Sequence, residues 1–223
     1  PNQSALNAGY GTGDSCGAYG NRNFYLYFSD WFGSPQFGNL VRTAGNSTVY
    51  LVSGNNKYPI ADINILGALA PLGGVSFGTQ EYLDSKTTGA LMGRVFRSAS
   101  GTVYFYDAGI KLGFTTCDQV TDYGSSCGAA VLLDDNQVLS FVTGPNMTHL
   151  FGTTSGKTFY ITGGTKREAY DAASLSQAAI TGGVNVLNET ALNNLPYGAP
   201  VLRSDVIVRD RATGENYIYS NSN

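Results

Sequence analysis

The sequence has few charged residues, and this shortage excludes several classes of function. Only 13% of its 223 residues are charged, and the net charge of −3 corresponds to a pI near 5.0. A protein that binds nucleic acid neutralises many phosphates with Lys and Arg, so we expect no nucleic-acid partner. The sequence also contains no run of 18 apolar residues, so we expect no membrane-spanning helix.

Histidine and acidic clusters are equally scarce. His149 is the one histidine, and no G-x-S-x-G sequence accompanies it, so we predict no catalytic triad. A zinc site needs more His and Cys than the chain contains. Calcium at Asp134 and Asp135 is a weaker hypothesis, because these residues lack the EF-hand spacing. We therefore predict no catalytic residue, no metal site and no cofactor.

The three cysteines predict one local disulfide. Cys117 and Cys127 flank a polar loop without histidine, and a bond between them would close that loop. The alternative is two free thiols. Cys16 then has no partner, unless one lies upstream of Pro1. A disulfide together with low charge favours an extracellular or cell-surface location.

Glycine and tyrosine are abundant, with 29 and 15 copies, and they gather in β-hairpin patterns. The clearest hairpin has a β-branched and aromatic run at 102–106, a turn at Asp107-Ala108-Gly109 and a second strand after Lys111. Similar hairpins are predicted at 48–60, at 158–169 and, incompletely, at 214–219. Four copies of one hairpin indicate a repeat architecture.

Two landmarks give the period of the repeat. The tyrosines Tyr50, Tyr104, Tyr160 and Tyr217 recur every 54 to 57 residues. The segments that begin at Gly89, Gly144 and Gly198 are 55 and 54 residues apart. Each repeat also contains a lead strand before the hairpin, a short helix after it, a third strand and a polar turn or helix. Asp62 and Asp171 are expected to cap two of the first helices.

The predicted fold is mainly β with short helices, built from units of about 54–56 residues in a propeller-like ring or a pseudo-symmetric barrel. A lone unit cannot bury both faces of its sheet, so the units must stack or close on one another. The predicted boundaries are an N-terminal extension or the tail of an upstream domain at 1–38 and a repeat domain at 39–223, whose units are 39–93, 94–147, 148–202 and a partial unit, 203–223.

The first 38 residues differ from the rest of the chain. The glycine-rich segment 9–17 lacks the lysine and the spacing of a phosphate-binding loop. The apolar residues within 21–32 fit a short amphipathic helix about as well as a strand. Gly33-Ser34-Pro35 ends either element.

Two stretches carry a resemblance to known proteins. Residues 19–24 and 28–34, Tyr-Gly-Asn-Arg-Asn-Phe and Phe-Ser-Asp-Trp-Phe-Gly-Ser, resemble the tail of a lysozyme-like or lytic-transglycosylase-like domain of secreted Gram-positive, especially actinobacterial, cell-wall proteins. The hairpin at 49–60 resembles the Tyr/Lys repeat that follows such domains, although Gly113 and Glu168 replace Pro59 in later repeats. The resemblance implies a surface-exposed bacterial module attached to a peptidoglycan-processing or adhesive protein, and it implies no activity for these residues.

Seven residues are candidates for ligand binding. Lys57, Lys111 and Lys166 follow the three hairpin turns and either face an acidic ligand or merely place charge on exposed strand ends. Trp31, Tyr58, Tyr106 and Phe114 are the candidates for stacking on a ligand, and the sequence pattern places the last three on the exposed side. Tyr50, Tyr104 and Tyr160 are predicted to lie in the core.

Three functional hypotheses follow. The first is a secreted, non-catalytic module that binds a cell-wall or cell-surface glycan, or a surface protein, in a carbohydrate-binding or adhesive role. The second is a glycan-cleaving enzyme with acidic residues in a central depression. The third is a structural subunit of an extracellular assembly, which would self-associate without affinity for glycans.

Overall fold

The computed structural model describes residues 37–210 and 212–220. The chain divides into the units Pro1–Phe37 and Gly38–Asn223, and every helix and strand below belongs to the second. Predictions about residues 1–36, including Trp31, Cys16 and the lysozyme-like resemblance, lie outside the described residues.

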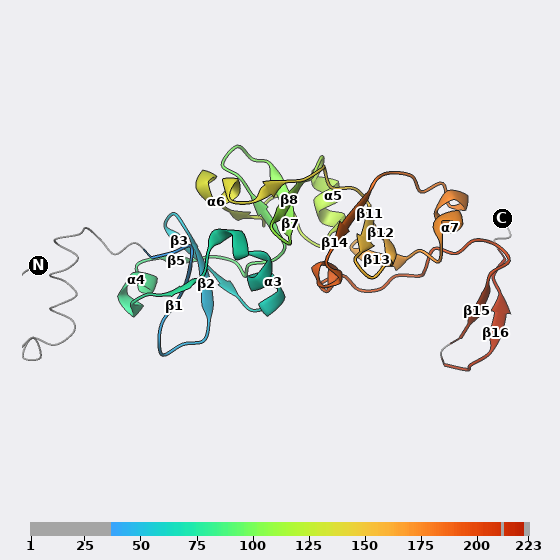
Figure 1. Ribbon diagram of the computed structural model, residues 1–223, viewed down its shortest axis with the longest axis horizontal. Coiled ribbons are helices and arrows are strands. Elements are labelled where there is room, and N and C mark those ends of the chain that lie inside the picture. The colour runs from blue at the N-terminus through green and yellow to red at the C-terminus, as the bar shows by residue number, and fades with distance from the viewer. Residues whose placement is uncertain (1–36, 211, 221–223) are drawn as a thin grey trace, which may run out of the picture. The chain divides into compact units, whose positions relative to one another are not determined.

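Three repeats of one topology follow one another along the chain (Figure 1). In repeat 1 (39–93), a lead strand pairs antiparallel with the first strand of a hairpin, and the third strand returns parallel to the lead strand. A short fifth strand pairs parallel with the second hairpin strand. The elements are β1 (Leu40–Arg42), β2 (Val49–Ser53), β3 (Asn56–Ile60), α3 (Ile63–Ala68), η1 (Ala70–Leu72), β4 (Val75–Phe77), α4 (Gln80–Asp84) and β5 (Thr87–Thr88), with sheet order β4-β1-β2-β3-β5.

Repeat 2 (94–147) has the same strand arrangement. Repeat 3 (148–202) has two isolated parallel bridges in place of the fifth strand, Lys166 with Tyr197 and Ala169 with Val201. The elements of repeat 2 are β6 (Val95–Arg97), β7 (Val103–Asp107), β8 (Ile110–Gly113), α5 (Cys117–Asp122), β9 (Val131–Leu132), α6 (Asp135–Leu139) and β10 (Val142–Thr143). Those of repeat 3 are β11 (Leu150–Thr153), β12 (Thr158–Thr162), β13 (Thr165–Glu168), α7 (Ala172–Gln177), β14 (Val184–Leu187) and η2 (Glu189–Leu192).

The partial repeat 4 (203–223) contributes β15 (Ile207–Arg209) and β16 (Asn216–Ile218), which pair antiparallel as a lead strand and a first hairpin strand. The mainly β fold with short helices is thus confirmed. The sheets are open, however, and among the described strands β15 and β16 pair only with each other. Closure into a propeller or a barrel is therefore not confirmed. No helix within 37–210 and 212–220 is long and apolar enough to cross a membrane.

Backbone hydrogen bonds join the two landmarks of the repeat. The landmark glycine of each repeat donates its N–H to the carbonyl of the lysine that follows the hairpin turn, at 2.9 Å in all three repeats. The pairs are Gly89 with Lys57, Gly144 with Lys111, and Gly198 with Lys166. The shared period of the glycines and the hairpins therefore reflects one repeated contact.

The pairing register corrects the sequence alignment of repeat 3 by one residue. Tyr50 lies opposite Val41 and Tyr104 opposite Phe96, whereas the equivalent pair in repeat 3 is Phe159 opposite Phe151. Tyr160 consequently occupies the other face of its sheet, because successive side chains of a strand alternate between faces.

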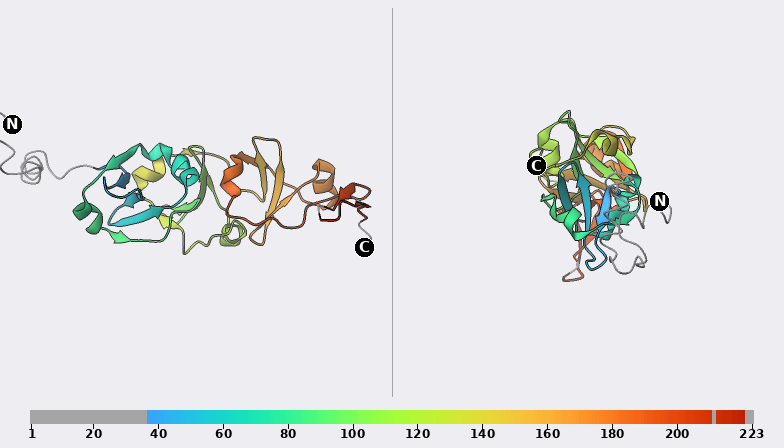
Figure 2. Two further views of the ribbon diagram at one scale, coloured as in Figure 1. Left: turned by 90° about the horizontal axis from the view of Figure 1, so that it is seen from below. Right: turned by 90° about the vertical axis from the view of Figure 1, so that its left-hand side faces the viewer.

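The repeats stack head to tail. We number the sheets after their repeats, as sheets 1, 2 and 3. The face of each sheet that carries the repeat lysine is called the lysine face, and the other face is called the opposite face. A first core joins the opposite face of sheet 1, with Leu40 and Leu51, to the lysine face of sheet 2, with Phe96 and Tyr106. A second core joins the opposite face of sheet 2 to the lysine face of sheet 3 in the same way, through Val95, Phe105, Leu112, Phe151, Phe159 and Ile161. The three sheets succeed one another in Figure 2.

Side chains cap five of the short helices. Asp62 and Asp171 accept backbone N–H bonds at the start of α3 and α7, as predicted. Thr79, Thr116 and Asp134 do the same for α4, α5 and α6.

Candidate functional site

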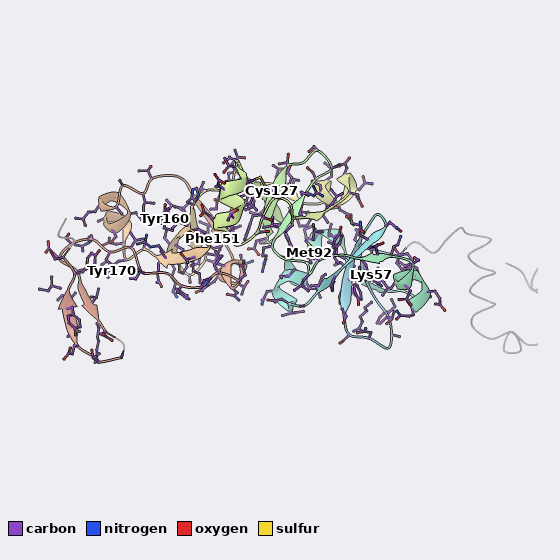
Figure 3. The ribbon with its side chains drawn as sticks, turned by 180° about the vertical axis from the view of Figure 1, so that it is seen from behind. Lys57, Met92, Cys127, Phe151, Tyr160 and Tyr170 are labelled. Atoms are coloured by element: carbon purple, nitrogen blue, oxygen red, sulfur yellow. A yellow bond between two sulfur atoms is a disulfide. The ribbon has the colours of Figure 1, made fainter. Side chains whose placement is uncertain are left out.

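The three repeat lysines are buried, with exposed fractions of 9%, 6% and 7% for Lys57, Lys111 and Lys166. Each amine donates to a carbonyl at or just beyond the end of the second helix of its repeat. Lys57 Nζ lies 2.7 Å from Leu83 O, and Lys166 Nζ lies 2.9 Å from Leu192 O (Lys57 is labelled in Figure 3). Lys111 Nζ contacts two carbonyls, those of Val138 and Phe141, at 3.0 and 2.6 Å.

This burial corrects the idea that these lysines only place charge on exposed strand ends. Each amine also lies near an aromatic ring, at 4.6 to 6.0 Å from the centroid of Tyr50, Tyr104 or Tyr197. Loss of hydration lowers the pKa of Lys111 and Lys166 below the usual 10.5. The ammonium groups are bound inside the fold, so the proposal below uses other residues for ligand contact.

Two of the four stacking candidates also lie in the core. Tyr58 is 8% exposed and Tyr106 is fully buried, where its hydroxyl donates to the Gly93 carbonyl. Their predicted exposure is wrong, because both faces of sheets 1 and 2 are covered and simple alternation no longer separates inside from outside. Tyr50, Tyr104 and Tyr160, predicted as core residues, are only half-buried.

Phe114, the third described stacking candidate, lines a hollow. The hollow has a volume of about 390 Å³ and lies where the ends of the β7–β8 hairpin meet the start of α5. The half-buried Phe114 ring packs edge-on against Phe105 and Tyr123. Besides Phe114, the walls include exposed hydroxyl side chains, those of Ser100, Thr102, Thr115 and Thr116. We call this site the Phe114 hollow.

The predicted disulfide between Cys117 and Cys127 is confirmed, and both cysteines line the Phe114 hollow. Cys127 is labelled in Figure 3. Cys117 is the first residue of α5, so the bond ties this helix to the loop that returns toward β9. The disulfide therefore holds one wall of the hollow in place, and the alternative of two free thiols is overturned.

A second hollow, also of about 390 Å³, lies where the three repeats meet, and we call it the junction hollow. Its lining includes a buried ion pair between Arg94 and Asp107. Arg94 also donates to the Asn64 carbonyl of repeat 1 at 3.1 Å, and Asp107 accepts the Asn188 N–H of repeat 3 at 2.8 Å. This one ion pair therefore links repeats 1, 2 and 3.

The remaining titratable candidates have structural partners. Asp134 caps α6 in a capping box with Gln137, and the described residues contain no group of three or more His, Cys, Asp or Glu side chains that could hold a metal. His149 Nε2 lies 3.0 Å from Asp122 Oδ2, and Asp122 Oδ1 also accepts the Gly163 N–H. This pair joins repeat 3 to α5 of repeat 2.

Sequence reasoning missed most residues of both hollows. The hydroxyl residues beside Phe114 come from two loops, and only the Thr115-Thr116 pair directly before Cys117 signalled a polar surface at the predicted disulfide. Arg94, directly before β6, and Asp107, at the end of β7, are separated by 13 residues, and nothing local marks them as partners. Their pairing depends on the strand register.

Comparisons with known proteins identify no family. No family model and no curated protein matches the chain. Among solved structures, the periplasmic assembly from the ESX-5 inner membrane complex is 11% identical, with a TM-score of 0.25 over 78% of this chain and 62% of that chain. An intact ESX-5 inner membrane complex gives 11% identity and a TM-score of 0.24 over 79% and 55%. The chain thus spans less than two thirds of each, and likeness at this level assigns neither fold nor function.

Proposed function

We propose that this chain is an extracellular, non-catalytic module that binds a cell-surface or cell-wall glycan in the Phe114 hollow. The observation that carries the proposal is the combination of a half-buried aromatic ring with four exposed hydroxyl side chains in one hollow. A binding site commonly combines apolar walls with a few polar groups that fix the orientation of the ligand.

The chemistry of the hollow suits a neutral glycan. Hydroxyl groups both donate and accept hydrogen bonds, so Ser and Thr side chains match the hydroxyls of a sugar. The hollow is lined by no charged residue among those described. Its apolar part is the half-buried Phe114 ring, which offers a surface for the non-polar face of a sugar ring. The disulfide supports an extracellular location, in keeping with the resemblance to secreted cell-wall modules.

The glycan-cleaving alternative receives less support. Hydrolysis requires two carboxyl groups that are free to act on the glycosidic bond. The junction hollow contains Asp107 and Glu189, but both oxygens of Asp107 are already engaged by Arg94 and by the Asn188 N–H. A ring-shaped closure of the repeats would also be needed for a central depression, and closure stays a prediction.

Filling the hollow tests the proposal. Ser100→Trp places a large side chain at an exposed rim position, outside the core. The matched control is Ser155→Trp, because Ser155 occupies the equivalent turn of repeat 3: Ser100 Oγ bonds to Ser98 Oγ at 2.8 Å, and Ser155 Oγ bonds to Thr153 Oγ1 at 2.9 Å.

Binding would be measured by titration calorimetry with chito-oligosaccharides and by co-sedimentation with purified peptidoglycan. We expect Ser100→Trp to weaken binding at least about 10-fold, equivalent to about 1.4 kcal/mol, and Ser155→Trp to leave it unchanged. Absence of binding by the unmodified protein to every glycan tested would contradict the proposal, as would equal binding by the two variants.

A further inference from the structure

The junction hollow points to a second site. We propose that it docks a peptide segment of a partner protein, which inserts an apolar side chain and carries a basic residue next to it. This inference is independent of the glycan proposal, because it concerns other residues at the other end of the β7–β8 hairpin. The Phe114 hollow includes Val103, where β7 begins, and the junction hollow includes Asp107, where β7 ends.

The ion pair beneath the junction hollow is not required by the repeat. At the junction of repeats 1 and 2, the neutral Ser53 performs the same task as Asp107: its Oγ accepts the N–H of Asp134, the N-cap residue of α6, at 3.1 Å. A neutral residue therefore suffices to join two repeats. At the next junction the chain instead buries Asp107 and the compensating Arg94, although a buried ion pair is seldom a net gain in stability. The charged pair contacts all three repeats where Ser53 joins two, and it forms a polar base for the hollow.

The walls of the hollow combine an apolar side with a polar side. Ile63 is 75% exposed although it begins α3, and beside it Gly67 leaves open space where a side chain would stand. Across from this helix, the side chains of Asn188 and Thr190 make no hydrogen bond to any described residue and line the hollow. An amide and a hydroxyl can pair with both the N–H and the C=O of a peptide group.

These features favour a peptide over a sugar. No aromatic ring is among the residues that line the junction hollow, so a sugar would lack a stacking surface there, whereas an aliphatic side chain can pack on the exposed Ile63. Peptide recognition commonly pairs main-chain hydrogen bonds with a pocket for a side chain.

The charge at the rim of the junction hollow favours a peptide with a basic residue next to its apolar side chain. Glu189 lines the hollow, and its side chain is 49% exposed. Lys157 Nζ lies 3.4 Å from Glu189 Oε1, and Ser155 Oγ donates to Glu189 Oε2 at 3.3 Å. Both contacts are long and exposed, so a ligand cation can share this carboxylate with them. The net charge of −3 also favours a basic partner over an acidic one.

The experiment uses the full chain and two capped dipeptides, Ac-Leu-Lys-NH2 and Ac-Leu-Glu-NH2, with chitotetraose as the third probe. Amide and side-chain amide shifts are followed by NMR during titration. Gly67→Phe fills the hollow from the open side of α3. Its matched control is Ser176→Phe, because the exposed Ser176 occupies the equivalent position of α7.

We expect Ac-Leu-Lys-NH2 to shift the resonances of Asn188, Thr190 and Ala68 in a saturable way. Ac-Leu-Glu-NH2 should bind at least threefold more weakly, and Glu189→Gln should remove that difference. Gly67→Phe should abolish the shifts and Ser176→Phe should retain them. The proposal is overturned if neither dipeptide shifts these resonances, if Gly67→Phe leaves binding intact, or if chitotetraose binds here in preference to the peptide. These outcomes do not test glycan binding at the Phe114 hollow, because Gly67→Phe does not touch that hollow.

Discussion

At the scale of single residues, the repeat lysine marks the repeat more consistently than the repeat tyrosine, because its contacts recur in all three repeats. Its stem crosses the lysine face, its amine bonds to a carbonyl 26 to 30 residues further along the chain, and its backbone carbonyl accepts the landmark glycine N–H. One residue therefore joins the hairpin, the end of the second helix and the landmark glycine. A long aliphatic stem with a hydrogen-bonding end suits this position, because it fills apolar space and still satisfies buried carbonyls.

Asp171 offers a test at the same scale. Its pKa is lowered below the usual 3.8, first because Arg203 Nε donates to Asp171 Oδ2 at 2.8 Å and then because Ser174 donates to Oδ1. A carboxyl with a lowered pKa in the folded state contributes stability above its unfolded pKa, and that contribution is lost as the pH falls through the folded pKa. We therefore expect the free energy of unfolding to fall below about pH 4, partly through this group.

Asp171→Asn should flatten this pH dependence while keeping the helix cap, because Asn is also a good N-cap residue. Urea unfolding at pH 7, 4 and 2.5 measures it. Asp118→Asn is the control, since Asp118 lies in the first turn of α5 and makes no side-chain hydrogen bond to a described residue. An unchanged pH profile in Asp171→Asn would contradict the assignment.

At the scale of elements, the sequence predicted the local features and missed those that depend on packing. The hairpins, the caps at Asp62 and Asp171 and the disulfide follow from turn residues, N-cap residues and cysteine spacing, which act over a few residues. The burial of Tyr58 and Tyr106 does not follow from such local signals, because it depends on a neighbouring sheet that covers a surface expected to be free. The lysine contacts likewise require knowledge of where the second helix ends.

The joints between repeats test the packing of these elements. Asp107→Ala should destabilise the protein by about 3–5 kcal/mol, because it leaves the buried Arg94 unpaired. Ser53→Ala removes the equivalent hydrogen bond at the first junction and leaves no buried charge unpaired. It should therefore lower the free energy of unfolding by about 1 kcal/mol. Urea unfolding measures both.

The double variant Arg94→Met with Asp107→Ser places the neutral residue of the first junction at the second one. It should recover most of the stability that Asp107→Ala loses, because no unpaired charge remains. Equal losses in Ser53→Ala and Asp107→Ala, or a double variant as unstable as Asp107→Ala, would show that the ion pair does not carry the difference between the junctions.

At the scale of the whole repeat domain, stability comes from shared cores, since no sheet buries both faces alone. Sheet 2 belongs to both cores, with Phe96 in the first and Phe105 in the second. This nearest-neighbour packing is typical of repeat proteins. It leaves the helices and loops that connect the strands free to carry binding sites, and these segments line most of both hollows.

Head-to-tail stacking is the claim on which the hollows and the joints depend, and contacts between methyl groups and aromatic rings measured by NMR test it most directly. The account predicts nuclear Overhauser contacts from leucine methyls of repeat 1 to the rings of Phe96 and Phe141 in repeat 2, and from methyls of repeat 2 to the rings of Phe151 and Phe159 in repeat 3. A spectrum in which these rings contact only methyls of their own repeat would contradict it.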